Sequence, residues 1–128
     1  MAKSISVAVV QAAPILFDLE ATLAKTEDLL SQCRDADLVL FPEAFVSAYP
    51  RGLSFGTVVG SRTEEGRVLW QRYWDSSLTE GDASFERLAQ MAAKAKTFLV
   101  IGVNEKDSLS GSMYCSLLYF GPNGQFLG

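Results

Sequence analysis

Two short apolar runs separated by an amphipathic segment constrain the fold of this chain more than any other feature. Residues 5–11 are rich in β-branched types and read as a mostly buried strand, and residues 37–41 form a second apolar run of strand length. Between them, apolar side chains recur at alternating spacings of four and three over residues 19 to about 34, which predicts a helix with Asp18 as its N-cap. The chain is therefore predicted to open as β-α-β.

The remaining sequence continues this α/β pattern. We predict, in chain order, a loop over residues 42–63, a helix over 64–75, a helix capped by Asp82, strands over 98–103 and 112–120, and a hairpin return from Gln125. The hairpin follows from the Asn123-Gly124 pair, which favours a tight two-residue turn. No repeat and no shift in composition marks a second domain, so residues 1–128 are expected to belong to one domain.

The composition excludes several classes of function. A chain of 128 residues that is 48% hydrophobic and 20% charged has the character of a globular domain. A net charge of -4 offers no broad cationic surface, so neither nucleic acid nor anionic lipid is expected as a partner. The apolar run at residues 5–10 is far too short to span a bilayer, and we expect a soluble protein of the cytoplasm without a membrane partner.

The sequence contains no histidine and only two cysteines, Cys33 and Cys115. The absence of histidine excludes histidine metal sites and every Ser-His or Cys-His catalytic pair within the chain. The two cysteines form no CxxC pair, so no metal site is expected. Cys33 falls on the apolar stripe of the first helix and Cys115 lies within a strand, and both are predicted to be small buried packing residues.

Glu43 is the strongest candidate for chemistry. It follows the strand that ends at Phe41, and in α/β sheets ligands bind beyond the carboxyl ends of the strands. Apolar neighbours on both sides lead us to expect a partly desolvated carboxylate that could act as a base. Taken alone, this position is equally consistent with a loop or capping residue.

The text around Glu43 resembles the nitrilase branch of the carbon-nitrogen hydrolase superfamily. The matching segments are Phe41-Pro42-Glu43-Ala44-Phe45, Tyr49-Pro50-Arg51-Gly52, Phe55-Gly56, Gly60-Ser61-Arg62 and Glu65-Gly66-Arg67, with further likeness at residues 9–12, 102–107 and 119–128. The Tyr-Pro-Arg-Gly continuation is more particular to nitrilases than to amidases. The resemblance implies an α/β fold, the N-terminal part of an α-β-β-α sandwich, which residues 1–128 would form incompletely.

The resemblance also implies a reaction. In that family a cysteine thiolate attacks a nitrile carbon, a glutamate takes the thiol proton and a lysine ammonium stabilises charge on the nitrogen, without metal or organic cofactor. Carried over, Glu43 is the general base and Tyr49 lines the substrate pocket. The family's lysine and cysteine would lie beyond Gly128, so this chain alone is expected to be inactive. A small nitrile or amide is the implied substrate, and a homo-oligomer the implied assembly.

Several alternatives stay open. The chain could be a non-catalytic truncated form that acts as an assembly or binding module, an amidase of the same superfamily, or an unrelated doubly wound binding domain. A helical aromatic set, Trp70, Tyr73 and Trp74, could form a binding platform, although we expect it to pack against the sheet or a neighbouring subunit. Arg51 and Arg62 could bind an anion or brace the loop.

Overall fold

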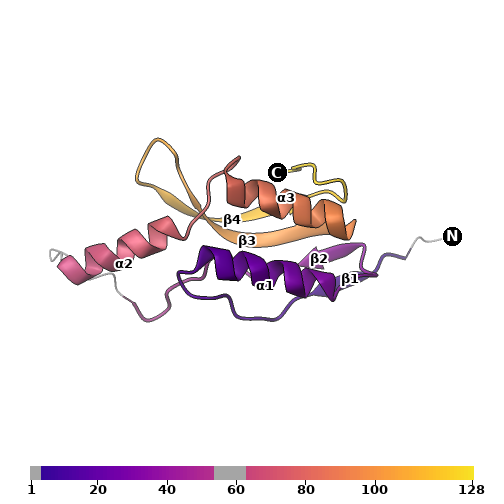
Figure 1. The fold of residues 1–128 in the computed structure, drawn as a ribbon, viewed down its shortest axis with the longest axis horizontal. Coiled ribbons are helices and arrows are strands. Elements are labelled where there is room, and N and C mark those ends of the chain that lie inside the picture. Colours follow the sequence, from indigo (N-terminus) through magenta and orange to yellow (C-terminus); the bar gives the residue numbers. More distant parts are fainter. Residues whose placement is uncertain (1–3, 54–62) are drawn as a thin grey trace.

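The computed structural model describes residues 4–53 and 63–128, and its elements follow the expected α/β order (Figure 1). In chain order these are β1 (Val7–Val9), α1 (Leu19–Ser31), β2 (Leu38–Leu40), α2 (Glu64–Asp75), α3 (Ala83–Ala95), β3 (Phe98–Lys106) and β4 (Met113–Phe120). The strands form one sheet in the order β1-β2-β3-β4, in which β1, β2 and β3 are parallel and β4 is antiparallel to β3. The predicted fold class is confirmed.

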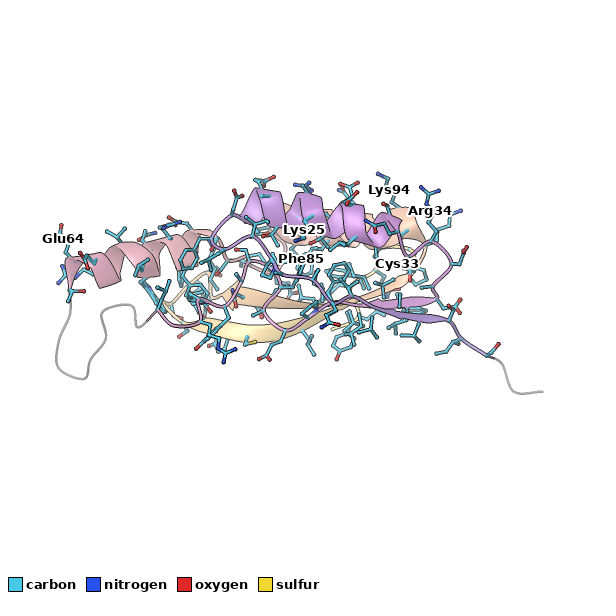
Figure 2. All side chains as sticks on the ribbon, turned by 90° about the horizontal axis from the view of Figure 1, so that it is seen from below. Lys25, Cys33, Arg34, Glu64, Phe85 and Lys94 are labelled. Atoms are coloured by element: carbon cyan, nitrogen blue, oxygen red, sulfur yellow. The ribbon has the colours of Figure 1, made fainter. Side chains whose placement is uncertain are left out.

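Helices α1 and α3 lie side by side on one face of the sheet (Figures 1 and 2). Their N-caps are the predicted ones, because Asp18 accepts a hydrogen bond from the amide of Ala21 and Asp82 accepts one from the amide of Phe85. Each helix buries the face that its apolar spacing predicts. Phe85 points from α3 toward the sheet (Figure 2), where its ring meets those of Phe120 and Phe126.

The core lies between these two helices and the sheet. Its fully buried members include Leu23, Leu88, Val39, Leu99, Ile101 and Phe120. The odd-numbered residues of β3 face this core, so its even-numbered residues face the other side of the sheet. On that other side, large apolar side chains are exposed: Val7, Val9, Phe98, Leu117 and Tyr119. In the described part of the chain, the sheet is therefore one half-covered layer, as expected for part of a sandwich.

Three elements differ from their predicted bounds by more than one residue at an end. The first strand covers only Val7–Val9, and α1 ends at Ser31 because the amides of Gln32 and Cys33 bond three residues back, which tightens the last turn. Strand β3 runs on to Lys106 instead of stopping at residue 103.

The extra length of β3 is paired on both edges. One edge pairs with β4 as far as Lys106, and the other edge pairs in succession with β2, with Val46 and with Leu78. The amide of Val46 donates to the carbonyl of Gly102 at 3.1 Å, and the amide of Leu78 donates to the carbonyl of Asn104 at 3.1 Å. Two loop segments that are far apart in the sequence therefore continue the backbone pairing that β2 begins along this edge of β3.

The predicted hairpin after β4 is confirmed. The amide of Gly121 donates to the carbonyl of Gln125 at 2.8 Å, and the amide of Leu127 donates to the carbonyl of Tyr119 at 2.8 Å. Gly124 at the turn has φ +81° and lies against the backbone of Ala89 in α3, so a side chain there would be strained and would collide. No described helix has the length and apolar character needed to cross a membrane.

Candidate active site

The turn after β2 places Glu43 above β3. The amide of Phe41 donates to the carbonyl of Val100 at 2.8 Å, and a few residues later the amide of Asn104 donates to the carbonyl of Val46 at 2.7 Å. The chain between these two hydrogen bonds leaves the edge of the sheet and loops over the face of β3. Glu43 lies on that loop, at the carboxyl end of β2, which is where the sequence predicts it.

Gly102 makes this turn sterically possible. A Cβ atom at position 102 would lie 2.3 Å from the carbonyl oxygen of Pro42 and 2.6 Å from the Cα of Glu43. The following residue, Ala44, has φ 48°, in the left-handed region that alanine rarely adopts. The turn thus presses its backbone onto the strand. A glycine inside an apolar strand was the available signal for such a close approach, and the sequence reasoning used it only as part of a family motif.

A pocket of about 350 Å³ opens beside Glu43. It draws residues from the turn, α2, β3 and β4, and is lined by Glu43, Ala44, Tyr49, Tyr73, Asn104 and Cys115. The structure therefore brings together the two residues that the resemblance predicts for the site, Glu43 and Tyr49. It also adds three polar side chains that the sequence did not single out for this role.

Cys115 is in direct contact with Glu43. Its Sγ donates a hydrogen bond to Oε1 of Glu43 at 3.4 Å, and the residue as a whole is exposed. The expectation that Cys115 is a buried packing residue is therefore wrong. The reason is register: Cys115 pairs with Asn104 on β3, and both side chains occupy the sheet face opposite α1 and α3.

The surroundings of Cys115 disfavour its thiolate. Partial burial of the thiol, its hydrogen bond to Glu43 and the negative charge of that carboxylate together raise the pKa of the Cys115 thiol above its ordinary value, against a smaller opposing contribution from the backbone amide of Ala44. The thiol is therefore held protonated at neutral pH. Without transfer of its proton to a base, Cys115 is therefore present as the thiol and not as the more reactive thiolate.

Asn104 and Tyr73 form the inner wall of the pocket. The hydroxyl of Tyr73 donates to Oδ1 of Asn104 at 3.3 Å, and Nδ2 of Asn104 donates to the carbonyl of Ala48 at 2.6 Å. Burial, followed by the nearby Cys115 and Tyr49, raises the pKa of the Tyr73 phenol above its usual value. Tyr73 is therefore a neutral hydrogen-bond donor here.

The aromatic residues of α2 divide between two roles. Trp74 packs as predicted, with the ammonium of Lys106 lying 5.7 Å from its ring centroid. Tyr73 also packs, 6.2 Å from the ring of Phe17, but its hydroxyl reaches the pocket, which the sequence reasoning missed. Trp70 is 41% exposed and meets the ring of Tyr73 at 5.9 Å edge to face.

The other candidate residues lie as follows. Glu43 is exposed, so the expectation of a partly desolvated carboxylate is wrong for this chain; the pocket lies on the sheet face that α1 and α3 do not cover. Tyr49 is 68% exposed at the pocket rim. Cys33 is partly buried against the core, in line with its predicted packing role. Arg51 is exposed, and Arg62 is outside the described residues.

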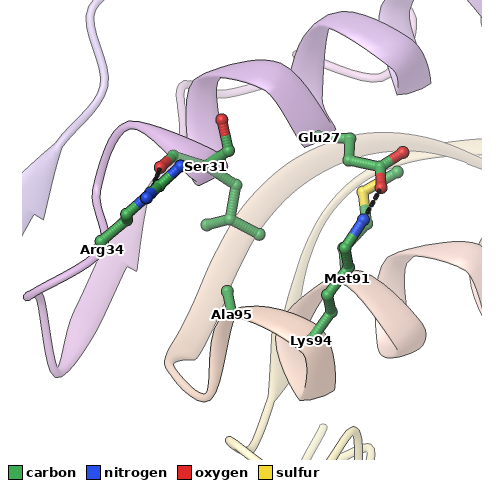
Figure 3. Close-up of a pocket in the computed structure, with 7 residues that line it drawn as sticks. Glu27, Ser31, Arg34, Met91, Lys94 and Ala95 are labelled. Carbon is green, nitrogen blue, oxygen red and sulfur yellow. Dashed lines mark hydrogen bonds and ion pairs between the residues drawn. The ribbon is translucent and has the colours of Figure 1, made fainter.

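A second pocket, of about 280 Å³, lies between α1 and α3 (Figure 3). Glu27 and Lys94 form an ion pair of 2.8 Å across it, and the Nε of Arg34 donates to the carbonyl of Ser31. Its charged groups are thus engaged with each other or with the helix backbone, and it is remote from Glu43. Over residues 4–53 and 63–128, no cluster of three or more His, Cys, Asp or Glu side chains could hold a metal ion.

The arrangement around Glu43 can accept a proton, and the exposed Tyr49 hydroxyl can donate a hydrogen bond to a small molecule. None of the side chains that line this pocket is cationic, and its cysteine is held as a thiol. The described residues thus place a carboxylate beside a polar wall.

Comparison with known proteins identifies the family of the chain. The sequence profile of the carbon-nitrogen hydrolase family matches residues 6–128. A bifunctional nitrilase/nitrile hydratase of Nicotiana tabacum is 44% identical over 122 residues, which cover 94% of this chain and 34% of that protein. An aliphatic nitrilase of Sinorhizobium fredii is 44% identical over 119 residues, which cover 91% of this chain and 38% of that protein. The chain thus spans about a third of the length of these relatives.

Solved structures show the same fold. A CN-hydrolase superfamily protein of Xanthomonas campestris superimposes with a TM-score of 0.70 at 16% identity, over 96% of this chain and 38% of that one. An N-terminal amidase superimposes with a TM-score of 0.68 at 22% identity, over 97% of this chain and 27% of that one. The fold, the position of the glutamate and the sequence relatives lead to one conclusion: the chain belongs to the carbon-nitrogen hydrolase family, in its nitrilase branch.

Proposed function

We propose that this chain contributes the general base and one wall of the substrate pocket to an enzyme that hydrolyses a nitrile to a carboxylic acid and ammonia. The observation that supports this most directly is the shared pocket of Glu43 and Tyr49, at the carboxyl end of β2. Relatives whose names include nitrilase, at 40–44% identity, favour a nitrile as the substrate.

In the proposed reaction Glu43 removes the proton from a cysteine thiol, and the resulting thiolate attacks the nitrile carbon to give a thioimidate. A lysine ammonium donates a hydrogen bond to the nitrogen as negative charge develops there. One water molecule then releases ammonia and leaves a thioester, and a second releases the acid and regenerates the thiol. Two waters are consumed per nitrile, and no metal or organic cofactor enters.

The lysine and the nucleophilic cysteine of this scheme are proposed to lie outside residues 1–128. Cys115 is not assigned this role because no cationic side chain lines its pocket to stabilise charge on the nitrile nitrogen. The chain alone is therefore expected to release no ammonia from aliphatic or aromatic nitriles. We further propose a homo-oligomer in the cytoplasm, to be tested by light scattering and cell fractionation of the complete gene product.

The decisive experiment measures ammonia release by the complete gene product and by its Glu43→Gln variant. Loss of the base is expected to lower kcat by about a hundredfold or more, the usual contribution of a general base. Glu86→Gln is the matched control, because Glu86 is exposed on α3, on the other side of the sheet. An active Glu43→Gln variant would overturn the proposal.

A second candidate substrate is an amide. It is favoured by the likeness to the N-terminal amidase structure and by the exposed Tyr49 hydroxyl at the pocket rim, which could bind an amide carbonyl as readily as a nitrile. Parallel assays with a nitrile and its corresponding amide separate the two. A third reading, a non-catalytic assembly module, is favoured by the exposed apolar face of the sheet, and it predicts no turnover of either substrate by the complete gene product.

A further inference from the structure

Asn104 ties three segments of the chain together. Its backbone amide donates to the carbonyl of Val46 at 2.7 Å, and its backbone carbonyl accepts from the amide of Leu78 at 3.1 Å. Its side chain adds the bonds to Ala48 and Tyr73, and the residue is 1% exposed. A buried carboxamide is costly unless its oxygen and nitrogen both have hydrogen-bond partners, and this orientation gives a partner to each.

The two side-chain bonds lead to the two aromatic residues of the pocket. The Nδ2 bond holds the carbonyl of Ala48, and the next residue is Tyr49. The Oδ1 bond holds the hydroxyl of Tyr73, which projects from α2. Ala48 has φ 77°, a conformation that alanine adopts only when its surroundings impose it, and the Asn104 amide is one of the groups that impose it.

Glu43 is held in a different way. Its turn is fixed by backbone pairing of Phe41 and Val46 with β3 and by the close approach of the backbone at Gly102. Removal of the Asn104 side chain leaves these backbone contacts in place. The position of the proposed base and the spacing of the two tyrosines are therefore set by separate groups.

We infer that Asn104 is a positioning residue that fixes the distance between Tyr49 and Tyr73, and that it thereby determines which substrate side groups fit the pocket. This role rests on the proposed function, because it assigns the specificity of the same site. It makes the pocket selective for a substrate whose side group fits between the two fixed tyrosine rings. Loss of the two Asn104 side-chain bonds widens the pocket without moving Glu43.

The test compares three variants of the complete gene product with a small and a large nitrile. Asn104→Asp keeps an acceptor for the Tyr73 hydroxyl but puts a carboxylate against the carbonyl of Ala48. Tyr73→Phe removes the bond to Asn104 and keeps the bond to Ala48. Asn104→Ala removes both bonds. We expect Asn104→Ala and Asn104→Asp to raise KM for the substrate that the wild type prefers by about tenfold, the equivalent of one buried hydrogen bond, with kcat changed less than about threefold. Tyr73→Phe should give a smaller change in the same sense.

A second measurement does not depend on activity. Hydrogen-deuterium exchange of the amides of residues 47–49 should become faster in Asn104→Ala, while exchange of the Val46 amide and of α3 stays unchanged. Leu88→Ala, a core variant remote from the pocket, controls for general loss of stability. Equal exchange rates of these loop amides in the wild type and in Asn104→Ala would overturn the positioning role of Asn104, even if the variant had no activity.

The two proposals fail in distinguishable ways. A gene product whose turnover is indifferent to Glu43→Gln overturns the proposed function, and the specificity role falls with it. A Glu43-dependent enzyme in which the Asn104 variants keep the wild-type KM and the wild-type preference between the two nitriles overturns the role of Asn104 alone. So does a parallel fall in kcat for both substrates that Leu88→Ala reproduces.

Discussion

The thiol of Cys115 donates a hydrogen bond to the carboxylate of Glu43 across 3.4 Å, although the two residues are 72 positions apart in the sequence. The contact exists because β4 runs antiparallel to β3 and brings position 115 opposite position 104, beside the turn that carries Glu43. A thiol in this place gives a chemical probe of the carboxylate.

The first prediction uses that probe. In a Cys33→Ser background, Glu43→Gln removes the negative charge that helps to raise the pKa of the Cys115 thiol, so more thiolate is present at pH 8 and alkylation by iodoacetamide becomes faster. Mass spectrometry of the Cys115 peptide over time gives the rate. Glu86→Gln should leave it unchanged. An unchanged or slower rate in Glu43→Gln would show that the carboxylate does not act on the thiol.

The second prediction concerns alkaline pH. The pKa values of Cys115 and Tyr73 are both raised in the folded chain, from ordinary values of 9.0 and 10.0, so the folded state holds these two protons more tightly than the unfolded state. Their contribution to stability is complete below pH 9 and is lost as the pH rises through the folded pKa values. Urea unfolding at pH 8 to 11 should show a fall in unfolding free energy that is shallower in Cys115→Ser with Tyr73→Phe. The same slope in this double variant would contradict the prediction.

The third prediction tests the close approach at Gly102. Gly102→Ala places a methyl group within 2.3 Å of the carbonyl oxygen of Pro42, and the backbone there cannot yield as a flexible side chain could. We expect a loss of about 1–3 kcal/mol in unfolding free energy, as for other overpacked sites, and loss of the Cys115 contact with Glu43. Gly111→Ala, where a Cβ meets no atom within 4 Å, is the matched control. Equal effects of the two changes would refute the steric argument.

The fourth prediction concerns the N-cap of α3. Asp82 accepts hydrogen bonds from the amides of Phe85 and Thr79, so Asp82→Ala leaves two backbone donors without their partner. The expected loss of unfolding free energy is about 1 kcal/mol. Glu86→Gln in the first turn of the same helix should change it far less, since that side chain is exposed. Denaturant midpoints of the two variants make the comparison.

The fifth prediction concerns the exposed face of the sheet. Leu117 and Tyr119 are 46% and 44% exposed on β4, and a face of this kind favours association or poor solubility of the isolated chain. Leu117→Lys combined with Tyr119→Lys should shift light scattering of the chain toward monomer. Leu109→Lys, at a 95% exposed position in the β3–β4 loop, should have no such effect. A wild-type chain that stays monomeric and melts cooperatively would contradict the prediction.

Local sequence patterns predicted the elements of this fold well, because each depends on near neighbours. The caps at Asp18 and Asp82, the helix over residues 64–75 and the Asn123-Gly124 turn are set within a few residues of chain. The end of β3 was not predicted. Its last residues are strand because they pair with Met113–Cys115 of β4 on one edge and with Val46 and Leu78 on the other, and such long-range pairing leaves no periodic trace in the sequence.

The candidate site was predicted only where one residue and its immediate neighbours define it. Glu43 could be located from a strand end, and a family resemblance supplied Tyr49. Cys115 and Asn104 required the register between β3 and β4, and Tyr73 required the packing of α2 against that sheet. A strand position read in isolation predicts burial for a cysteine, whereas the half-covered sheet exposes it.

The edge of β3 that pairs with β2, Val46 and Leu78 sets the spacing of the segments around the pocket, because these segments form backbone hydrogen bonds with its even-numbered residues. Inserting a single residue after Leu99 would reverse the alternation downstream. It would put Gly102 on the core side of the strand and Ile101 beneath the proposed base. Insertions and deletions are therefore tolerated at the tip of the β3–β4 loop but not inside the strand. Side chains that line the pocket can be substituted while the spacing of its backbone segments stays the same.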